Sequence, residues 1–258
     1  MSEASVTVES SGPIAHVRIT NPGKRNAFTW RMYDQLEQIA LTVADDPTVR
    51  VVVLRGSPED GFAAGTDITQ FDGFDGSAGI DYERRVGKVL AALAAIPVPT
   101  IAAVERTAVG AGLAVAAYCD LIIAEPRAKF GAPIARTLGN TLPAGVVNRL
   151  RIRIGAAATL NLLLTASLTP AENLVASGFV YALAGSEGIE VTAAALAEQV
   201  AALAPLTLRA IKELNRRLDS SSLPDDTDLL ELCYGSADFR EGVRAFVEHR
   251  RPEWTGTP

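Results

Sequence analysis

The sequence predicts an α/β fold in which a mostly parallel sheet, covered by helices, is followed by a largely helical region. From the N-terminus to Ala124, short apolar runs alternate with amphipathic segments in the order strand, helix, strand, helix. Beyond Pro143 nearly every segment has helical periodicity. The 258 residues show no internal repeat and no low-complexity linker, so we expect one large domain, or one domain with an appendage.

The first elements are expected to be two strands and a capped helix. Residues 5–9 and 14–19 are strand-like runs on either side of turn-forming residues, which predicts a hairpin. Thr29 is a suitable N-cap for a helix that continues to about residue 44. Residues 50–54, apolar after Arg50, predict a buried strand.

The stretch from residue 100 to residue 124 is expected to organise the site. A buried strand at 100–104 precedes Gly110 and Gly112, which allow backbone to approach backbone or a ligand closely. A small, fully apolar helix at 113–118 and a second strand at 121–124 follow. The first N–H groups of a helix have no partner inside it, so this turn can hold negative charge.

Two segments frame this stretch. Residues 71–80 are punctuated by three glycines and predict a mobile loop, followed by a helix over 82–95. In the second half of the chain, helices are expected at 154–164, 170–177, 189–203 and 205–217, with an acidic segment at 225–250 completing the chain.

Composition excludes several classes of protein. The net charge of −6, without a basic tract, argues against binding to nucleic acid or to an anionic membrane surface. Cys119 and Cys233 lie far apart among apolar residues and are expected to be free core thiols in a reducing compartment. No signal peptide is evident and no apolar stretch is long enough to span a membrane, so we expect a cytoplasmic protein.

Several familiar chemistries lack their residues. There is no G-x-S-x-G elbow, no Walker loop and no metal-ligand spacing, and His16 and His249 sit in a predicted strand and near the C-terminus. A dinucleotide-binding alternative remains open, because Gly110-Ala111-Gly112 follows a strand and opens a helix. It fits poorly, since Val115 occupies the third glycine position and no acid follows about 20 residues later.

Five segments together resemble the enoyl-CoA hydratase/isomerase (crotonase) family. They occur in the family's order over nearly the whole chain: Asn21 to Phe28, Gly61 to Ile68, Val109 to Gly112 with Cys119 to Ala124, Phe130 to Pro133, and Phe239 to Pro252. The resemblance implies a crotonase-type ββα spiral with a C-terminal helical trimerisation region, here residues 1–195 and 196–258. It also implies an acyl-CoA substrate, no metal or other cofactor, and a homotrimer or dimer of trimers.

The resemblance also implies an oxyanion hole of two backbone N–H groups, which falls on Thr66 and on Ala111. An enolate gathers charge on the thioester oxygen, where each aimed donor can contribute about 10²–10³ in rate. Further positions match the family's CoA path or could meet its phosphates: Lys24, Arg25, Ala27, Ala64, Asp67 and Ile68. The alternatives are that Lys24 and Arg25 are solvated surface charges and that Asp67 caps the next turn.

The family's catalytic acids are missing. The two glutamate positions of its hydratases are Ala114 and Ile134, and a third position used by some relatives is Ala144. Arg136 and Asn140 are therefore the candidates for polar groups facing the acyl end, although they could instead bridge subunits or cap a turn. Two hypotheses remain: an acyl-CoA lyase or isomerase with other catalytic groups, or an acyl-CoA-binding protein with little turnover.

Overall fold

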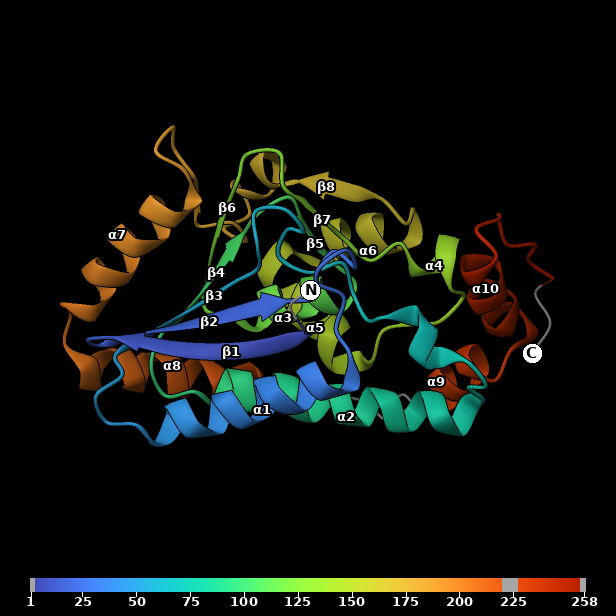
Figure 1. The fold of residues 1–258 in the computed structure, drawn as a ribbon, viewed down its shortest axis with the longest axis horizontal. Helices are drawn as coiled ribbons and strands as arrows, with labels where there is room; N and C mark the ends of the chain where they lie inside the picture. Colours follow the sequence, from blue (N-terminus) through green and yellow to red (C-terminus); the bar gives the residue numbers. More distant parts are fainter. Residues whose placement is uncertain (1–2, 220–226, 256–258) are drawn as a thin grey trace.

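The computed structural model describes residues 3–219 and 227–255, apart from the side chain of Leu229. A six-stranded sheet has the order β1-β2-β3-β4-β6-β9, and a three-stranded sheet has the order β5-β7-β8. Only the β1–β2 and β7–β8 pairs are antiparallel. Helices pack around both sheets, with α1, α2 and α8 side by side along one long side of the molecule (Figure 1). This confirms the α/β fold class.

The N-terminal elements form as the sequence predicts. β1 (Ser5–Ser11) and β2 (Ile14–Thr20) pair as a hairpin, and β3 (Val51–Arg55) runs parallel to β2. Between β2 and β3, α1 (Trp30–Asp45) begins after Thr29, whose hydroxyl accepts the N–H of Met32 at 3.3 Å. That bond satisfies one of the four N–H groups that a helix start leaves without a partner.

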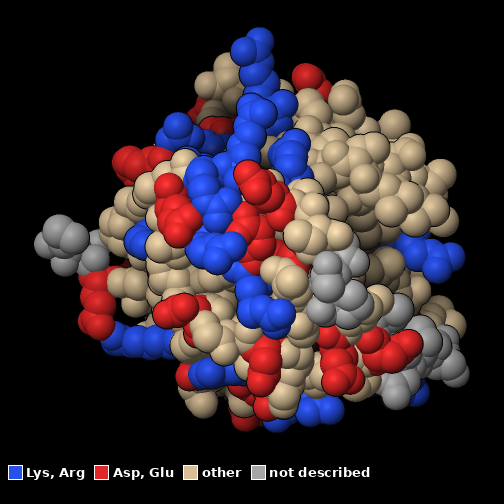
Figure 2. All heavy atoms as spheres, turned by 90° about the vertical axis from the view of Figure 1, so that its right-hand side faces the viewer, with Lys and Arg blue, Asp and Glu red and all other residues tan. Residues whose placement is uncertain are grey.

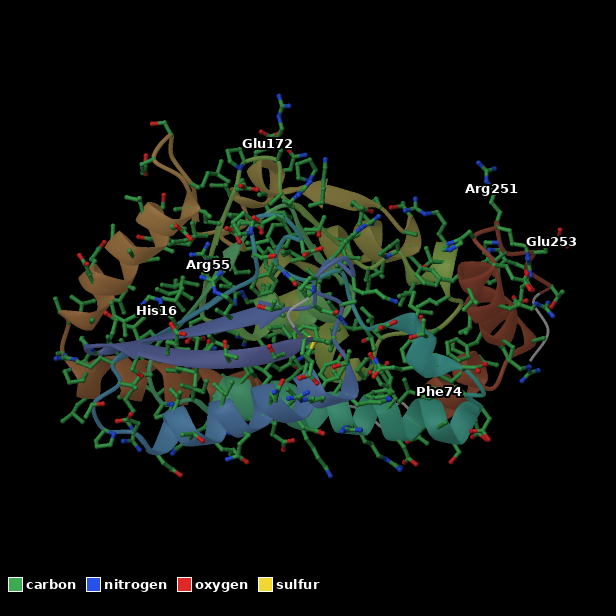
Figure 3. The ribbon with its side chains drawn as sticks, in the orientation of Figure 1. His16, Arg55, Phe74, Glu172, Arg251 and Glu253 are labelled. Carbon is green, nitrogen blue, oxygen red and sulfur yellow. The ribbon has the colours of Figure 1, made fainter. Side chains whose placement is uncertain are left out.

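The inner strands of the large sheet, β3, β4 and β6, are buried on both faces, as their continuous apolar sequences require. In β3, Val52 and Leu54 face the main core, whereas Val51 and Val53 face a smaller core beneath α7 (Ile189–Ala201). Arg55 lies at the end of β3, beside α7 (Figure 3), and pairs with Glu105 at 3.1 Å and with Glu190 of α7. Burial raises the pKa of Glu105, and the Arg55 guanidinium opposes that shift.

The central stretch contains one strand more than predicted. β4 (Thr100–Val104) and β6 (Leu121–Ala124) are neighbours in the large sheet, and α3 (Ala111–Tyr118) lies between them in the chain. The polar break before Gly110 leads into β5 (Thr107–Val109), which pairs with β7 (Lys129–Gly131) in the small sheet. Three residues are too few to show a strand periodicity, so the sequence gives no signal for β5.

The prediction of a mobile loop over residues 71–80 is wrong. A 3₁₀ turn, η1 (Ile68–Phe71), is followed by α2 (Gly76–Ala95), which starts six residues earlier than predicted. The Asp75 side chain caps α2 by accepting the N–H of Ala78 at 2.8 Å. Gly79 is needed for close packing, since a Cβ there would lie 2.1 Å from the ring carbon Cγ of Tyr234.

The second half of the chain is mostly helical, with one wrong prediction. The expected helix at 170–177 is instead β8 (Leu168–Pro170) and the short 3₁₀ turn η2 (Ala171–Leu174). The remaining elements are α4 (Ile134–Thr137), α5 (Ala144–Ile154), α6 (Ala156–Leu164), β9 (Ala182–Leu183), α8 (Pro205–Asp219), α9 (Thr227–Tyr234) and α10 (Ala237–Val247).

Part of the C-terminal prediction stays open. The proposed domain boundary after residue 195 falls within α7 and stays a prediction, as does a trimerisation role for residues 196–258. Residues 225–226 of the expected acidic segment lie outside the described residues. Within the described ranges no single helix is both long and apolar enough to cross a membrane. Among these residues only the helix pair α7 and α8, which is sharply bent at its break, is long and apolar enough when the two helices are taken together.

The contact between α2 and α9 predicts opposite effects for two glycine substitutions in α2. Gly79→Ala should lower the free energy of unfolding by about 1–3 kcal/mol, because the new methyl group overlaps the Tyr234 ring. Gly87→Ala is the matched control, since a Cβ at Gly87 meets nothing within 4 Å and alanine is the better helix former by about 0.8–1 kcal/mol. Urea unfolding would measure both, and a Gly79→Ala protein as stable as the parent would contradict this packing.

Candidate active site

One cavity collects most of the residues that the sequence singled out. Its walls come from the 64–68 segment and η1, from α2, from the start of α3, and from the chain between Pro133 and Val146, and Phe246 of α10 closes one side. Within α10 and just beyond its end, Glu241 forms ion pairs with Arg244 and Arg250, on a face where charges of both signs are interleaved (Figure 2).

Two backbone donors in this wall have no partner in the described structure. The N–H of Ala111 is the first of α3, and neither it nor the N–H of Thr66 makes a hydrogen bond within the described part of the chain. Both residues line the cavity. Their neighbours are fixed, because Val109 N–H donates to the Ala63 carbonyl at 2.9 Å and Gly110 N–H donates to the Gly131 carbonyl at 2.9 Å. A ligand oxygen is the natural partner for such free donors.

The Thr66 side chain lies between two buried tyrosines. Its Oγ1 is 2.6 Å from the hydroxyl of Tyr33 and 2.8 Å from that of Tyr82. Burial raises the pKa of both phenols, and the Glu83 carboxylate adds to the shift in each case. The two tyrosines therefore stay protonated and fix the Thr66 side chain, which holds this part of the backbone in place.

A second hydrogen-bond chain crosses the opposite wall. Asn140 Nδ2 donates to the hydroxyl of Tyr234 at 3.0 Å, and that hydroxyl donates to Glu83 Oε1. Glu83 is only 7% exposed and lines the cavity together with Asn140. The Asn140 amide oxygen is buried without a hydrogen-bond partner in the described structure. Burial, with the Glu83 charge nearby, raises the pKa of Tyr234 well above its usual value.

The cavity brings together five of the predicted site residues and both replaced acid positions, and it leaves one predicted catalytic residue outside. Its lining includes Thr66, Ala111, Asn140, Ala64, Ile68 and the two replaced acid positions, Ala114 and Ile134. Arg136, on the short helix α4, is exposed and does not line the cavity. The geometry therefore gives the predicted catalytic role of Arg136 no support.

The remaining predicted binding residues lie in or against the 64–68 segment and do not line the cavity. The Arg25 carbonyl accepts the N–H of Ala64 at 3.0 Å, and Ala27 is buried in the same loop. Asp67 caps η1 through the N–H of Thr69 at 3.2 Å and lies 3.9 Å from the amine of Lys24, so it has the structural role that the sequence left open. Lys24 and Arg25 remain exposed on the surface.

Sequence analysis missed the acidic and phenolic groups of the cavity. The sequence does contain a signal for Glu83. This residue lies on the same face of α2 as the buried residues Gly79, Val86 and Leu90, and a charged residue is unusual on the buried face of a helix. Tyr234 carried no such signal, since its partner Glu83 is 151 residues away in the chain.

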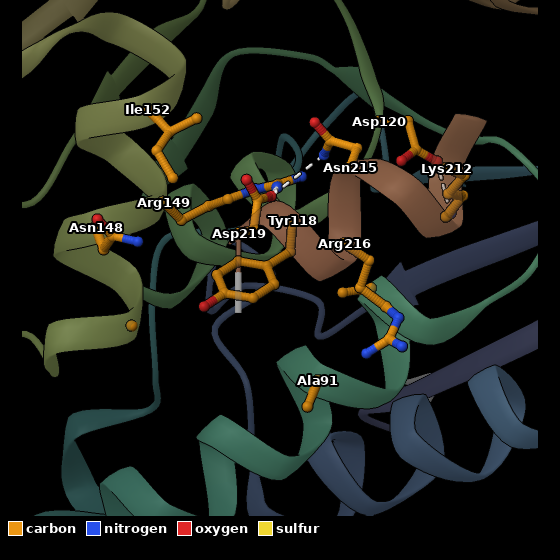
Figure 4. Close-up of a pocket in the computed structure, with 12 residues that line it drawn as sticks. Ala91, Tyr118, Asp120, Asn148, Arg149, Ile152, Lys212, Asn215, Arg216 and Asp219 are labelled. Atoms are coloured by element: carbon orange, nitrogen blue, oxygen red, sulfur yellow. Dashed lines mark hydrogen bonds and ion pairs between the residues drawn. The ribbon is translucent and has the colours of Figure 1, made fainter. Parts of the chain in front are cut away.

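A second cavity lies between α2, α5 and α8 (Figure 4) and has a volume of about 230 Å³. Four of its charged groups are paired with one another, Lys212 with Asp120 at 2.6 Å and Arg149 with Asp219, and Arg216 pairs with Glu213. It contains none of the free backbone donors, so we assign the chemistry to the first cavity. Among the described residues no group of three or more His, Cys, Asp or Glu could hold a metal ion.

Comparison with known proteins identifies the family. The sequence model described as enoyl-CoA hydratase/isomerase matches residues 9–257. A probable enoyl-CoA hydratase of Mycobacterium bovis is 30% identical over 99% of both chains. The chain belongs to the enoyl-CoA hydratase/isomerase family. This family membership agrees with the resemblance carried by the five sequence segments.

Solved structures agree with this membership. An enoyl-CoA hydratase/carnithine racemase of Magnetospirillum magneticum is 31% identical, with a TM-score of 0.80 over 99% of this chain and 97% of that chain. A methylmalonyl-CoA decarboxylase, solved in complex with 2-nitronate-propionyl-CoA, is 26% identical, with a TM-score of 0.87 over 97% of this chain and 98% of that chain. Enzymes with different reactions therefore share this fold, and the reaction depends on the residues in the cavity.

The buried tyrosines predict a loss of stability at alkaline pH. Tyr33, Tyr82 and Tyr234 have pKa values above the ordinary 10.0 in the folded protein, so above pH 10.0 the unfolded chain releases protons that the folded protein retains. Stability is therefore complete below pH 10.0 and falls as the pH rises, by up to about 1.4 kcal/mol per pH unit for each tyrosine. Urea unfolding at a series of pH values measures this slope, and constant stability beyond pH 10.0 would contradict it.

Proposed function

We propose that this protein is an acyl-CoA-processing enzyme that holds the thioester oxygen of its substrate between the N–H groups of Thr66 and Ala111. The observation that carries the proposal is that these two backbone donors have no hydrogen-bond partner among the described residues and that both residues line one cavity. Membership of the enoyl-CoA hydratase/isomerase family supports the class of substrate.

In this arrangement the backbone stabilises charge that develops during the reaction. When a proton leaves the carbon next to the thioester carbonyl, the electron pair moves onto the carbonyl oxygen and forms an enolate. Two N–H donors already fixed in place stabilise that oxygen without reorganising, and each is worth about 10²–10³ in rate. The Ala111 methyl group leaves its own N–H available, because the donor belongs to the backbone.

The side chains of the cavity argue against hydration as the native reaction. Ala114 and Ile134 both line the cavity, and neither can hold a water molecule or transfer a proton. A lyase or isomerase reaction, which uses the enolate without two acids to activate water, fits these residues better. The absence of both glutamates also favours the second candidate, an acyl-CoA-binding protein without turnover. The enzyme and the binding protein differ in whether bound acyl-CoA is chemically changed.

We also propose that Lys24 and Arg25 meet the phosphates of CoA. Both side chains are exposed, and their loop is hydrogen-bonded to the 64–68 segment that lines the cavity. A CoA chain leaving the cavity along that segment would pass them. Their positive charge suits phosphate groups, and salt should weaken that part of the binding.

The proposal predicts binding of CoA thioesters without rapid hydration. Butyryl-CoA should bind in calorimetry and NAD should not, because the cavity offers oxyanion donors and no dinucleotide motif. Hydration of crotonyl-CoA should be absent or slow, since each missing acid or base is worth about 10²–10⁴-fold. Hydration at an ordinary enzyme rate would contradict the proposal. As a gain-of-function control, the double variant Ala114→Glu and Ile134→Glu should hydrate crotonyl-CoA faster than the parent.

We propose, in addition, that the protein forms a homotrimer or a dimer of trimers. Large apolar side chains are exposed along α6 and α8: Leu160, Leu164, Leu206, Ile211, Leu214 and Leu218. Leu164, Leu206 and Leu218 are each at least 76% exposed, which leaves large apolar side chains uncovered on both helices in one chain.

A trimer predicts a sedimentation mass of three times 27.2 kDa, or six times for paired trimers. Replacing Leu164 by Glu should shift the mass toward the monomer, because a carboxylate cannot be buried unpaired in an apolar contact. A parent protein that sediments as a single chain at micromolar concentration would contradict the proposed assembly.

A further inference from the structure

We propose that Glu83 is the group that takes and returns a proton at the acyl chain, and that Tyr234 and Asn140 position it. This inference rests on the proposed function, because it needs a thioester bound at Thr66 and Ala111. It places the acid–base group on α2, in a different wall of the cavity from Ala114 and Ile134.

The first argument is the place of the carboxylate. Glu83 is 7% exposed, yet it lines a cavity whose nearby walls are apolar, with Val86, Leu142 and Val146 among them. Burying a carboxylate costs several kcal/mol unless hydrogen bonds compensate, so a buried stripe of α2 would ordinarily carry an apolar residue here. A proton-transfer group is a recurrent reason for such a residue to be in a cavity.

The second argument is the direction of the hydrogen bonds. Asn140 Nδ2 donates to the Tyr234 hydroxyl, so the single proton of that hydroxyl is directed at Glu83 Oε1. Glu83 Oε1 is thereby held as the acceptor of the Tyr234 hydroxyl, and burial raises the pKa of that hydroxyl. Tyr234 thus orients Glu83 without competing for its proton.

The third argument connects this chain to the oxyanion site. Tyr82 precedes Glu83 in α2, and its hydroxyl is 2.8 Å from Thr66 Oγ1. This contact fixes the second turn of α2 against the residue whose N–H is proposed to bind the thioester oxygen. The proton acceptor Glu83 and the residue Tyr82, which contacts Thr66, are therefore neighbours on one helix. This arrangement fixes the proton acceptor relative to the group that is proposed to bind the carbonyl oxygen.

The step is balanced without an added reagent. The C–H bond at the α-carbon breaks, the proton moves to a Glu83 carboxylate oxygen, and the electron pair forms the enolate whose charge lies on the thioester oxygen. Return of the proton to the same carbon restores the substrate, and return to the γ-carbon of an unsaturated chain moves the double bond. The Glu83 carboxylate interacts electrostatically with the hydroxyl groups of Tyr33 on α1, Tyr82 on α2 and Tyr234 on α9, and it contributes to the raised pKa of each.

The experiment measures hydrogen exchange at the α-carbon. The full-length protein is incubated in D₂O with saturated acyl-CoAs from acetyl to octanoyl, and deuterium incorporation is followed by mass spectrometry. Saturated chains cannot be hydrated or isomerised, so exchange reports proton transfer alone. Glu83→Gln keeps the size of the side chain and an acceptor for Tyr234 but cannot take a proton. Glu198→Gln, an exposed position on α7, is the matched control.

The proposal predicts that the parent and Glu198→Gln exchange deuterium at equal rates. The exchange rate of Glu83→Gln should fall by at least about 100-fold. The acyl-CoA affinity and melting temperature of Glu83→Gln should stay close to those of the parent. Tyr234→Phe should reduce exchange about 10-fold in the parent and have almost no effect in Glu83→Gln, because the hydroxyl acts through the carboxylate. If Glu83→Gln unfolds, Glu83→Asp, which keeps the carboxylate, should retain measurable exchange.

Undiminished deuterium exchange in Glu83→Gln would overturn the inference. Acyl-CoA binding by the parent without any exchange would also overturn it, although the proposed thioester site would then still stand. A parent that binds none of these acyl-CoAs would overturn the proposed function itself, and the inference with it.

Discussion

The site depends on the hydrogen bonds that hold the segment before Thr66 against β5 and the start of α3. Ala63 donates to the Thr107 carbonyl at 3.0 Å and accepts from Val109 at 2.9 Å. Gly112 permits this approach, since a Cβ there would lie 2.2 Å from the Ala63 carbonyl oxygen. These contacts fix two backbone segments that each present an N–H group without a partner among the described residues, so the proposed oxyanion site depends on the backbone and not on the side chain at position 111.

The opposite wall depends on a different contact, the packing of α9 on α2. Gly79 allows the Tyr234 ring to lie against the helix, and this position brings the Tyr234 hydroxyl to Glu83. In the described part of the chain, nine aromatic ring pairs cluster near this point, among Trp30, Phe71, Phe74, Tyr82, Tyr234, Phe239 and their neighbours. A carboxylate held in such surroundings interacts more strongly with a nearby charge or proton than it does in water.

Local signals in the sequence predicted the parts of the fold that depend on near neighbours. The cap at Thr29, the apolar strands and the glycine turn before α3 all follow from residues within one element. The glycines at 76 and 79 were misjudged because glycine serves both loops and close helix contacts, and only distant residues of α9 and the turn after it distinguish the two: Glu231 and Gly235 beside Gly76, and Tyr234 beside Gly79. Asn140 was singled out for its polarity, but the chain to Glu83 joins three segments that only tertiary packing brings together.

The central claim is that a thioester carbonyl is polarised by the N–H groups of Thr66 and Ala111. Infrared difference spectroscopy of butyryl-CoA, labelled with ¹³C at the carbonyl carbon, measures this polarisation directly in the complex. Two donors should lower the carbonyl stretching frequency relative to free butyryl-CoA, and Glu83→Gln should leave that shift unchanged because it removes no backbone donor. A bound thioester with the frequency of the free compound would contradict the account.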